Sequence, residues 1–262
     1  MIKISVITVC YNAISTIEPT ILSVLNQTYP NVEYIIIDGG STDGTVDIIK
    51  KRADRLAYWI SEPDKGIYDA MNKGIAVATG EYLNFMNAGD VFYNKNVIES
   101  IFMKGYTEDF IVGTALLKNS KKKWKAVPSD FTFIDVCDGG AVNHQASFIK
   151  KNLFEKGYDI SVEIIADELF FLDKIVFSSH SYRAISEIVC IYDTTGISCQ
   201  KENLRKIIDE RQKFLKTILP ERILQDYQNS RSMIKKKISK TIERGFRKLN
   251  IRMIIRKILI NA

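Results

Sequence analysis

Short apolar runs and helical patterns alternate along the first 85 residues of the chain. Ile2–Val9 and Tyr34–Ile37 are apolar and mostly β-branched, which is typical of strands buried on both faces of a parallel sheet. Between them, apolar residues recur at helical spacing over 16–26, with Pro19 in the first turn. The pattern continues with helices expected over 42–52 and 68–77 and strands over 56–60 and 81–85. This β-α-β-α-β-α-β order predicts an α/β fold with a doubly wound, mostly parallel sheet flanked by helices.

The later part of the chain has fewer clear patterns. A strand is expected over 111–117, a buried helix over 169–176, and an amphipathic helix over 204–219. From 234 to 260, apolar residues recur at helical spacing with lysines and arginines between them, which predicts a basic amphipathic helix. We therefore expect one domain over 1–220, with halves 1–115 and 116–220, and a basic helical tail over 221–262.

The net charge of +6 belongs to this tail. Residues 231–262 hold eleven Lys or Arg and one acid, Glu243, so the rest of the chain carries a net charge of −4. A charged fraction of 26% and an aromatic fraction of 10% exclude a disordered chain. The four cysteines form no Cys-x-x-Cys pair, so reduced thiols are expected rather than a zinc site. Because the sequence shows no signal-peptide pattern and no apolar run of about 18 residues, we expect a cytoplasmic location.

Polar clusters directly follow three of the expected strands. Tyr11-Asn12 follows the first strand, Asp38-Gly39-Gly40-Ser41 the second, and Asn87-Ala88-Gly89-Asp90 the fourth. A turn would explain any one of these clusters. In a doubly wound sheet, however, ligands bind beyond the carboxyl ends of the strands. Three such clusters in one sheet therefore indicate a ligand site at that edge.

Four stretches of the sequence resemble the family 2 glycosyltransferases, which have the Rossmann-like GT-A fold. They are SVITVCYNA, SVLNQTYPNVEYIIIDGGSTDGT, DKGIYDAMNKGIAVATGEYLNFMNAGD and NHQASFIKKNLFEKGYDISVEIIADELFF, and they lie in the family's order over about the first 200 residues. The resemblance implies transfer of a sugar from a nucleotide-sugar donor, expected to be UDP-linked, to an acceptor hydroxyl. It also implies inversion at the anomeric carbon and a divalent metal ion. Residues 1–115 would then bind the donor and residues 116–220 the acceptor.

By this resemblance, the loop after the second strand holds the nucleoside, and Asp38 is the candidate to bond the base or the ribose. Gly39 stands where the family more often has a second acid, which leaves the choice of nucleotide open. Tyr11 resembles the ring that stacks on the base, and a core tyrosine is the alternative. Asn12 could bond the base or close the turn. Lys65 could meet a phosphate or be a turn residue.

The motif Asn-Ala-Gly-Asp at 87–90 stands where the family carries its metal motif, and it resembles a branch that acts in bacterial surface-polysaccharide synthesis. Mn²⁺ or Mg²⁺ prefers oxygen ligands and would bridge the donor's two phosphates. Asp90 is the expected carboxylate ligand, and Asn87 could offer an amide oxygen. A β-turn in which Asp90 caps a helix is the alternative.

Asp167 is the expected catalytic base, because Ala166-Asp167 matches the family's acid before an apolar helix. An inverting transfer needs a base within hydrogen-bond reach of the acceptor hydroxyl. A helix N-cap is the alternative role for Asp167. His144 and Gln145 match a His-Gln pair that precedes a strand in this branch of the family. His144 could bond the acceptor or a phosphate, and a buried, satisfied histidine is the alternative. Asp38, Asp90 and Asp167 are expected to meet around a single diphosphate-sized cleft.

The basic tail, residues 231–262, has several candidate partners. A basic amphipathic helix can lie on an anionic membrane, with each basic residue contributing about 1 kcal/mol near the surface. Peripheral attachment to the inner face of the cell membrane would suit a glycan or lipid-linked glycan acceptor in capsule, O-antigen or exopolysaccharide synthesis. Packing on the catalytic domain and a homo-oligomer contact are the alternatives. Nucleic acid is not expected, because the tail lacks interleaved aromatic residues and the body is net acidic.

Two other functions stay open at this point. The reduced acid content of the metal motif would also fit a nucleotide-sugar-binding protein that has lost transfer activity. A nucleotidyltransferase is a weaker alternative, because it would need a glycine- and lysine-rich phosphate loop after the first strand. Cys10-Tyr11-Asn12-Ala13 is not such a loop.

Overall fold

The computed structural model describes residues 1–118, 123–124 and 142–230, and the chain divides into two compact units, Met1–Arg211 and Gln212–Ala262. The predicted basic helix over 234–260, Cys137 and most of the exposed basic turn near Lys118–Lys125 lie outside the described residues. Within the described part, no helix is both long enough and apolar enough to cross a membrane.

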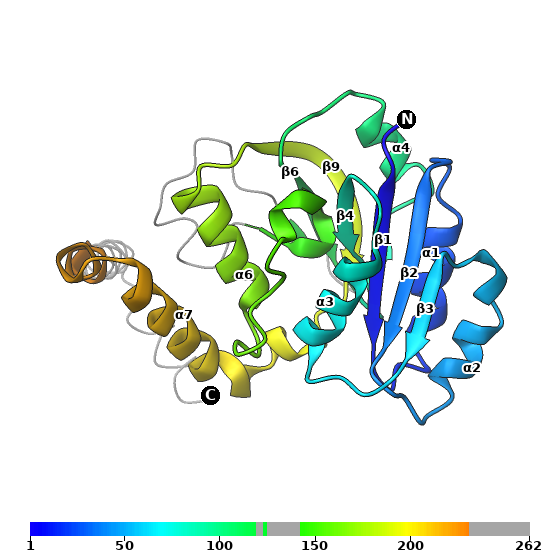
Figure 1. Cartoon of the computed structure of the whole chain (residues 1–262), viewed down its shortest axis with the longest axis horizontal. Coiled ribbons are helices and arrows are strands. Elements are labelled where there is room, and N and C mark those ends of the chain that lie inside the picture. The colour runs from blue at the N-terminus through cyan, green and yellow to red at the C-terminus, as the bar shows by residue number, and fades with distance from the viewer. Residues whose placement is uncertain (119–122, 125–141, 231–262) are drawn as a thin grey trace, which may run out of the picture. The chain divides into compact units, whose positions relative to one another are not determined.

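The first four strands form the parallel half of one sheet (Figure 1). β1 (Ile4–Cys10) lies between β2 (Val32–Asp38) and β4 (Tyr82–Phe85), and β3 (Tyr58–Ser61) flanks β2. The connecting helices are α1 (Ile17–Leu25), α2 (Thr45–Lys50) and α3 (Ile67–Val77). These elements confirm the predicted order, although their ends differ from the predicted ones by up to a few residues.

Helices cover both faces of this half of the sheet, which explains why its strands lack polar alternation. Successive β1 side chains enter opposite layers, because side chains alternate along a strand. Ile4 and Val6 lie in the core that includes α1, whereas Ile7 and Val9 lie in the core that includes α3. Burying an aliphatic side chain of this size contributes about 1.5–3 kcal/mol. The hydrophobic layers therefore fix the register of β1 and the direction in which its carboxyl end points.

Beyond β4 the sheet becomes mixed. β8 (Ser147–Lys150) pairs antiparallel with β4 and with β6 (Phe110–Leu117), while β9 (Tyr182–Tyr192) runs parallel to β6. β5 (Val91–Phe92) pairs with β9, and β7 (Lys123–Trp124) with β6, both antiparallel. β6 was predicted from its own pattern, and β8 confirms the strand expected after His144-Gln145. β5, β7 and β9 were not predicted from the sequence.

The helices of this half are α4 (Val97–Phe102), α6 (Ala166–Phe171) and α7 (Leu204–Ile218). The predicted helix over 169–176 begins earlier, at Ala166, and continues beyond Phe171 as a π-helix, Leu172–Phe177. Single 3₁₀ turns cover Ala53–Arg55, His144–Ala146, Lys151–Phe154, Ile197–Cys199 and Lys201–Asn203.

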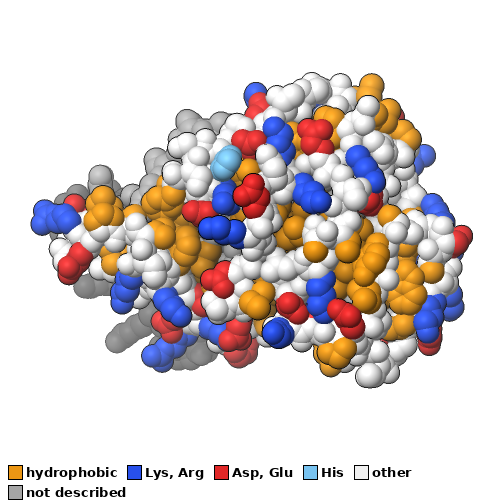
Figure 2. Space-filling model, viewed as in Figure 1, with side chains coloured by type: hydrophobic (Ala, Val, Ile, Leu, Met, Phe, Trp, Pro, Cys, Tyr) orange, Lys and Arg blue, Asp and Glu red, His pale blue; other side chains and the backbone are white. Residues whose placement is uncertain are grey.

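Two tight turns shape the edge of the sheet where β1, β2 and β4 end. The chain leaves β1 through Asn12, whose φ of 47° lies in the left-handed region that asparagine tolerates better than most residues. After β4 it turns at Gly89, with a φ of 108°, which favours glycine. Figure 2 shows acidic and basic side chains interspersed on the face drawn there.

Candidate active site

A cavity of about 660 Å³ lies in the unit Met1–Arg211, at the carboxyl edge of the parallel strands. Its wall comes from the turns after β1 and β4, the 3₁₀ turn before β8, the start of α6 and the loop after β9. Ile207 and Arg211 of α7 also contribute. The volume falls within the range of about 300–1,000 Å³ that is usual for small-molecule sites.

Most residues predicted from the sequence line this cavity. They are Tyr11, Asn12, Asn87, Asp90, His144 and Asp167. Asp38 and Lys65 do not line it. Of the three carboxylates expected to meet around one cleft, the structure therefore brings together Asp90 and Asp167 and leaves Asp38 outside.

Asp38 is fully buried and accepts hydrogen bonds from residues of two neighbouring segments. One carboxylate oxygen accepts the backbone N–H of Ser41 at 2.8 Å and the hydroxyl of Ser61 at 2.7 Å, and the other accepts the Ser41 hydroxyl at 2.5 Å. Burial alone would raise the pKa of Asp38, but the hydrogen bonds from Ser41 and Ser61 hold it below its usual value. In the structure both oxygens of Asp38 accept hydrogen bonds from within the protein, and the expected role of Asp38 in bonding the base or the ribose stays a prediction.

Two of the residues expected near the nucleoside, Tyr11 and Asn12, line the cavity. The ring of Tyr11 is 66% exposed, so the core-tyrosine alternative is wrong. Asn12 closes the loop, because its side-chain oxygen accepts the N–H of Thr42 at 3.0 Å and its own N–H donates to Ser41 at 2.7 Å. Lys65 is exposed in the turn before α3.

Asp90 is 3% exposed and holds two segments together. Its carboxylate accepts the backbone N–H of Asp193 at 2.7 Å and the side-chain amide of Gln145 at 3.0 Å. Burial raises the pKa of Asp90 to about 6, because the desolvation penalty on the charged form exceeds the effect of these hydrogen bonds. The residue precedes β5 rather than a helix, so the helix-cap alternative is wrong.

The surroundings of Asp90 contain unpaired oxygen atoms. The side-chain oxygens of Asn87 and Gln145 are buried without a hydrogen-bond partner, and both residues line the cavity. Burying an oxygen atom without a partner costs folding free energy unless a ligand binds it. Hard cations prefer amide oxygens of this kind as ligands. Among the described residues, no group of three His, Cys, Asp or Glu could hold a metal. The residues therefore fit a cation whose remaining ligands come from phosphate and water.

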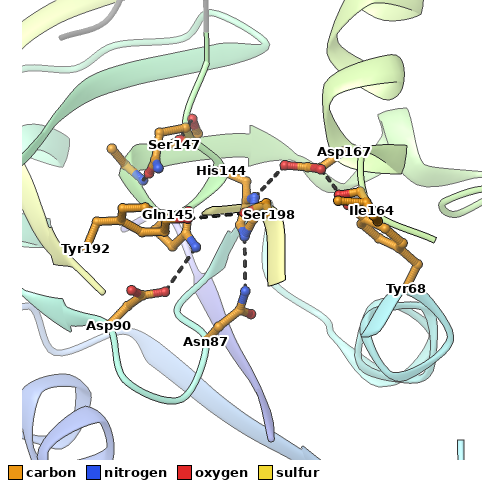
Figure 3. Close-up of polar contacts among 12 residues, drawn as sticks. Tyr68, Asn87, Asp90, His144, Gln145, Ser147, Ile164, Asp167, Tyr192 and Ser198 are labelled. Atoms are coloured by element: carbon orange, nitrogen blue, oxygen red, sulfur yellow. Dashed lines mark hydrogen bonds and ion pairs between the residues drawn. The ribbon is translucent and has the colours of Figure 1, made fainter. Parts of the chain in front are cut away.

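Asp167 is the centre of a hydrogen-bonded chain across the cavity wall (Figure 3). Its Oδ1 accepts the hydroxyl of Tyr68 at 2.6 Å, and its Oδ2 lies 2.6 Å from Nδ1 of His144. On the other side of the imidazole, Nε2 of His144 lies 3.1 Å from the amide nitrogen of Asn87. Burial would raise the pKa of Asp167, but His144 outweighs that effect and lowers it.

The start of α6, which carries Asp167, is fixed by two acids and an arginine. Glu210 accepts the backbone N–H groups of residues 163–165 at 3.0–3.3 Å, directly before the helix. Glu168 forms a two-pronged ion pair with Arg211, at 2.5 and 2.8 Å, on the cavity wall. Asp167 itself forms no side-chain cap of the helix, whose N-cap residue is Ile165. The N-cap alternative for Asp167 is therefore wrong.

The family model described as glycosyl transferase family 2 matches residues 5–168, which is more than half of the chain and includes both Asp90 and Asp167. The chain belongs to glycosyl transferase family 2. A protein of Mycobacterium tuberculosis named as an uncharacterized glycosyltransferase is 35% identical over 214 residues, covering 76% of this chain and 78% of the relative. A PGL/p-HBAD biosynthesis glycosyltransferase of Mycobacterium bovis is 28% identical over 171 residues, covering 62% and 66%. The protein is thus a glycosyltransferase.

Solved structures with a similar fold include complexes with nucleotide-sugars. Residues 1–349 of S. aureus TarS, in complex with UDP-GlcNAc, match with a TM-score of 0.65 at 18% identity, covering 86% of this chain and 70% of that one. The mannosyltransferase PcManGT from Pyrobaculum calidifontis, in complex with GDP-Man and Mn²⁺, matches with a TM-score of 0.57 at 20% identity, covering 82% and 62%. These likenesses show the GT-A fold and confirm the predicted fold class.

Three residues of the cavity wall had no role of their own predicted from the sequence: Tyr68, Asp193, and Gln145 of the His-Gln pair. Tyr68 was assigned only to the start of a helix, although its hydroxyl reaches Asp167. Asp193 belongs to an Asp-Thr-Thr-Gly cluster that directly follows the apolar end of β9. A polar cluster directly after a strand is the same pattern that marked the other three clusters. Recognising β9 in the sequence would therefore have pointed to Asp193.

Proposed function

We propose that this glycosyltransferase moves a sugar, with inversion, from a UDP-linked donor to an acceptor hydroxyl. The observation that carries the proposal is the single cavity that combines an exposed aromatic ring, Tyr11, with the buried oxygens around Asp90 and the acid–base pair of Asp167 and His144. The UDP and UDP-GlcNAc complexes of TarS support UDP as the nucleotide. GDP-Man in the mannosyltransferase complex makes GDP the competing choice to test.

The donor would lie along the cavity with its base on the ring of Tyr11. Base–aromatic stacking contributes about 1–3 kcal/mol. Asp90 and the unpaired oxygen of Asn87 would hold Mn²⁺ or Mg²⁺ at the diphosphate end of the donor. When bound there, the cation would neutralise the charge that builds up on the leaving diphosphate. Lys65 is excluded from this proposal because it does not line the cavity.

The acceptor would enter on the side of the cavity that carries His144 and Asp167. Its hydroxyl loses a proton to this pair as the oxygen attacks the anomeric carbon, and the bond to the diphosphate breaks on the opposite face. Proton removal of this kind contributes about 10²- to 10⁴-fold to the rate. Glu168 and Arg211 line the same wall and pair with each other, and in this proposal they would contact a polar acceptor.

We further propose that the acceptor is a lipid-linked glycan in surface-polysaccharide synthesis, reached by a protein held at the membrane surface. The support is the eleven basic residues and the apolar helical pattern within 231–262. Sedimentation with anionic vesicles should pellet the full chain but not a variant that lacks residues 231–262. Equal pelleting of the two proteins, or none, would contradict membrane attachment.

A thermal-shift screen with UDP-GlcNAc, UDP, GDP-Man and GDP, each with and without Mn²⁺, tests the donor proposal. A ligand at about 100 times its Kd adds about 2.7 kcal/mol of stability, which raises the melting temperature by several degrees. We expect the uridine compounds with Mn²⁺ to give the largest shifts. Larger shifts with the guanosine compounds, or none at all, would contradict a UDP-linked donor.

A binding protein without transfer activity is the second candidate, because both oxygens of Asp90 accept hydrogen bonds within the protein. Release of UDP from UDP-GlcNAc separates the two functions. An enzyme turns the donor over, at least slowly with water as the acceptor, and the Asp90→Ala variant does not. Binding of UDP-GlcNAc without any turnover would favour the second candidate.

A further inference from the structure

We propose that Tyr68 is a positioning residue, whose hydroxyl holds the carboxylate of Asp167 in the orientation that proton removal requires. The inference rests on the proposed transfer reaction, with Asp167, the base expected from the sequence, as the group that takes the acceptor's proton. In this inference Tyr68 acts through Asp167 and exchanges no proton with the substrate.

The hydroxyl of Tyr68 joins two elements that meet at the cavity wall (Figure 3). Tyr68 belongs to the first turn of α3, and its hydroxyl oxygen lies 2.6 Å from Oδ1 of Asp167 and 2.7 Å from the backbone oxygen of Ile164. A phenol has one hydrogen, and a carboxylate accepts it more strongly than a neutral carbonyl does, because the bond is charge-assisted. The hydrogen of Tyr68 is therefore directed mainly at Asp167.

Hydrogen-bonding partners on both oxygens fix the plane of the Asp167 carboxylate. Nδ1 of His144 lies 2.6 Å from Oδ2, and this contact alone would leave the carboxylate free to rotate about it. The bond from Tyr68 to Oδ1 removes that rotation. Because each oxygen of an ionised carboxylate has two lone pairs, both bonds can persist while a substrate hydroxyl approaches Asp167 from the cavity.

Tyr68 is itself held rigidly, as a positioning residue must be. It is 5% exposed, and its ring packs against that of Tyr158, with 5.4 Å between the ring centroids. Both rings belong to the core that includes α3 and α6, together with Phe85 and Phe170. Side chains in such a close-packed core occupy single low-energy rotamers. The hydroxyl of Tyr68 is therefore a fixed point against which Asp167 is oriented.

The orientation of a base affects the reaction rate more than it affects donor binding. The base must lie about 2.6–3.2 Å from the hydroxyl that it deprotonates, and a misplacement of about 1 Å can cost about 10²-fold in rate. Both partners of the Tyr68 hydroxyl lie at the start of α6, and neither belongs to the residues proposed to bind the donor. Loss of this hydroxyl should therefore lower kcat and leave the affinity for the donor unchanged.

Tyr158 offers a matched control in the same core. Its hydroxyl is also deeply buried, but among the described residues it has no hydrogen-bond partner, and the residue does not line the cavity. Tyr68→Phe and Tyr158→Phe each remove one buried hydroxyl and keep the aromatic ring. The two variants therefore differ in whether the lost hydroxyl was bonded to Asp167.

Release of UDP from UDP-GlcNAc, with Mn²⁺ and with water as the acceptor, measures the effect on the reaction. We expect Tyr68→Phe to lose about 10- to 100-fold in kcat, with a KM within about twofold of the wild-type value. Tyr158→Phe should keep both values. A purely structural role of Tyr68 would instead raise KM together with the loss in kcat. That result, or a kcat of Tyr68→Phe within about twofold of the wild type, would overturn the inference.

Unfolding of the full chain in urea tests the contact between Tyr68 and Asp167 without any substrate. Tyr68→Phe should lower the urea midpoint of the wild type, and should lower it less in an Asp167→Ala background, where the hydroxyl keeps only Ile164 as a partner. Equal lowering in both backgrounds would overturn the inference.

The two measurements separate this inference from the proposed function. If the wild type releases UDP and Tyr68→Phe does so at the same rate, the proposed transfer stands and the inference falls. If the wild type releases no UDP from UDP-GlcNAc, the proposed donor falls, and the urea measurement decides whether Tyr68 holds Asp167.

Discussion

The carboxylate of Asp64 occupies the space in which a side chain at Gly39 would lie. A Cβ atom built at Gly39 would collide with Oδ2 of Asp64 and would lie 3.5 Å from the ring of Tyr11. Another oxygen of Asp64 accepts the N–H of Gly66 at 2.8 Å, which ties the turn before α3 to this place. The space that a side chain at position 39 would fill is thus occupied by an acid from a different loop.

Introducing an acid at position 39 should therefore destabilise the protein unless Asp64 is removed. We expect Gly39→Asp to lower the free energy of unfolding by about 1–3 kcal/mol, through overpacking and through repulsion between like charges. Combining it with Asp64→Gly should recover most of the loss. Urea unfolding gives the values, and Gly196→Asp is the control, because nothing lies within 4 Å of a Cβ at Gly196. A double variant no more stable than Gly39→Asp would contradict this occupation of the space by Asp64.

The buried Asp90 should make the protein less stable at high pH than it would be with a neutral side chain. Its pKa of about 6 in the folded state lies above the usual value near 3.8, so folding favours the protonated form. The stability that this proton contributes is complete below about pH 3.8 and is lost as the pH rises through about 6. Two pKa units correspond to about 3 kcal/mol, which sets the upper scale of the effect.

Asp90→Asn tests this directly in metal-free buffer. Gln145 can rotate its amide and offer its unpaired oxygen to the new side chain, so the fold should be kept. Relative to the wild type, we expect a gain in the free energy of unfolding at pH 8 that vanishes at pH 4. Asp109→Asn serves as the opposite control, because hydrogen bonds from Ser181 lower the pKa of Asp109 despite its burial. That variant should lose stability at pH 8. A loss in Asp90→Asn at pH 8 would contradict the account.

Glu210 should contribute to stability by binding the chain before α6. Its carboxylate accepts three backbone N–H groups, and such charge-assisted bonds are stronger than neutral ones. We expect Glu210→Gln to lower the free energy of unfolding by about 1–2 kcal/mol. Glu202→Gln, at an exposed position before α7, is the control and should change it little. Equal effects of the two substitutions in urea unfolding would argue against the anchoring role.

The sequence predicted the parallel half of the fold well, because its strands are buried on both faces and its helices have a clear apolar side. It did not predict β5, β7 and β9. β9 mixes exposed and buried positions irregularly, and β5 and β7 have two residues each. Short strands of this kind are specified by their neighbours in the sheet rather than by their own pattern.

The same limit applies to the site. The sequence correctly marked Asp90 and Asp167 as cavity residues, since each belongs to a motif beside a recognisable element. It could not show that Ser61, 23 residues away, would bind Asp38, or that His144 would face Asp167. Hydrogen-bond partners that are distant in the chain decide whether a carboxylate is free to meet a ligand, and their pairing appears only in the folded structure.

The most direct test of the central claim, that the cavity beside Tyr11 binds a uridine nucleotide, is the Kd of UDP with Mn²⁺ by titration calorimetry. Tyr11→Ala is compared with Tyr93→Ala, which removes another exposed tyrosine that lies outside the cavity. Loss of about 1–3 kcal/mol of stacking should raise the Kd of UDP about 5- to 150-fold in Tyr11→Ala. The Kd of Tyr93→Ala should equal that of the wild type. Wild-type affinity in Tyr11→Ala, or equal weakening in both variants, would contradict the claim.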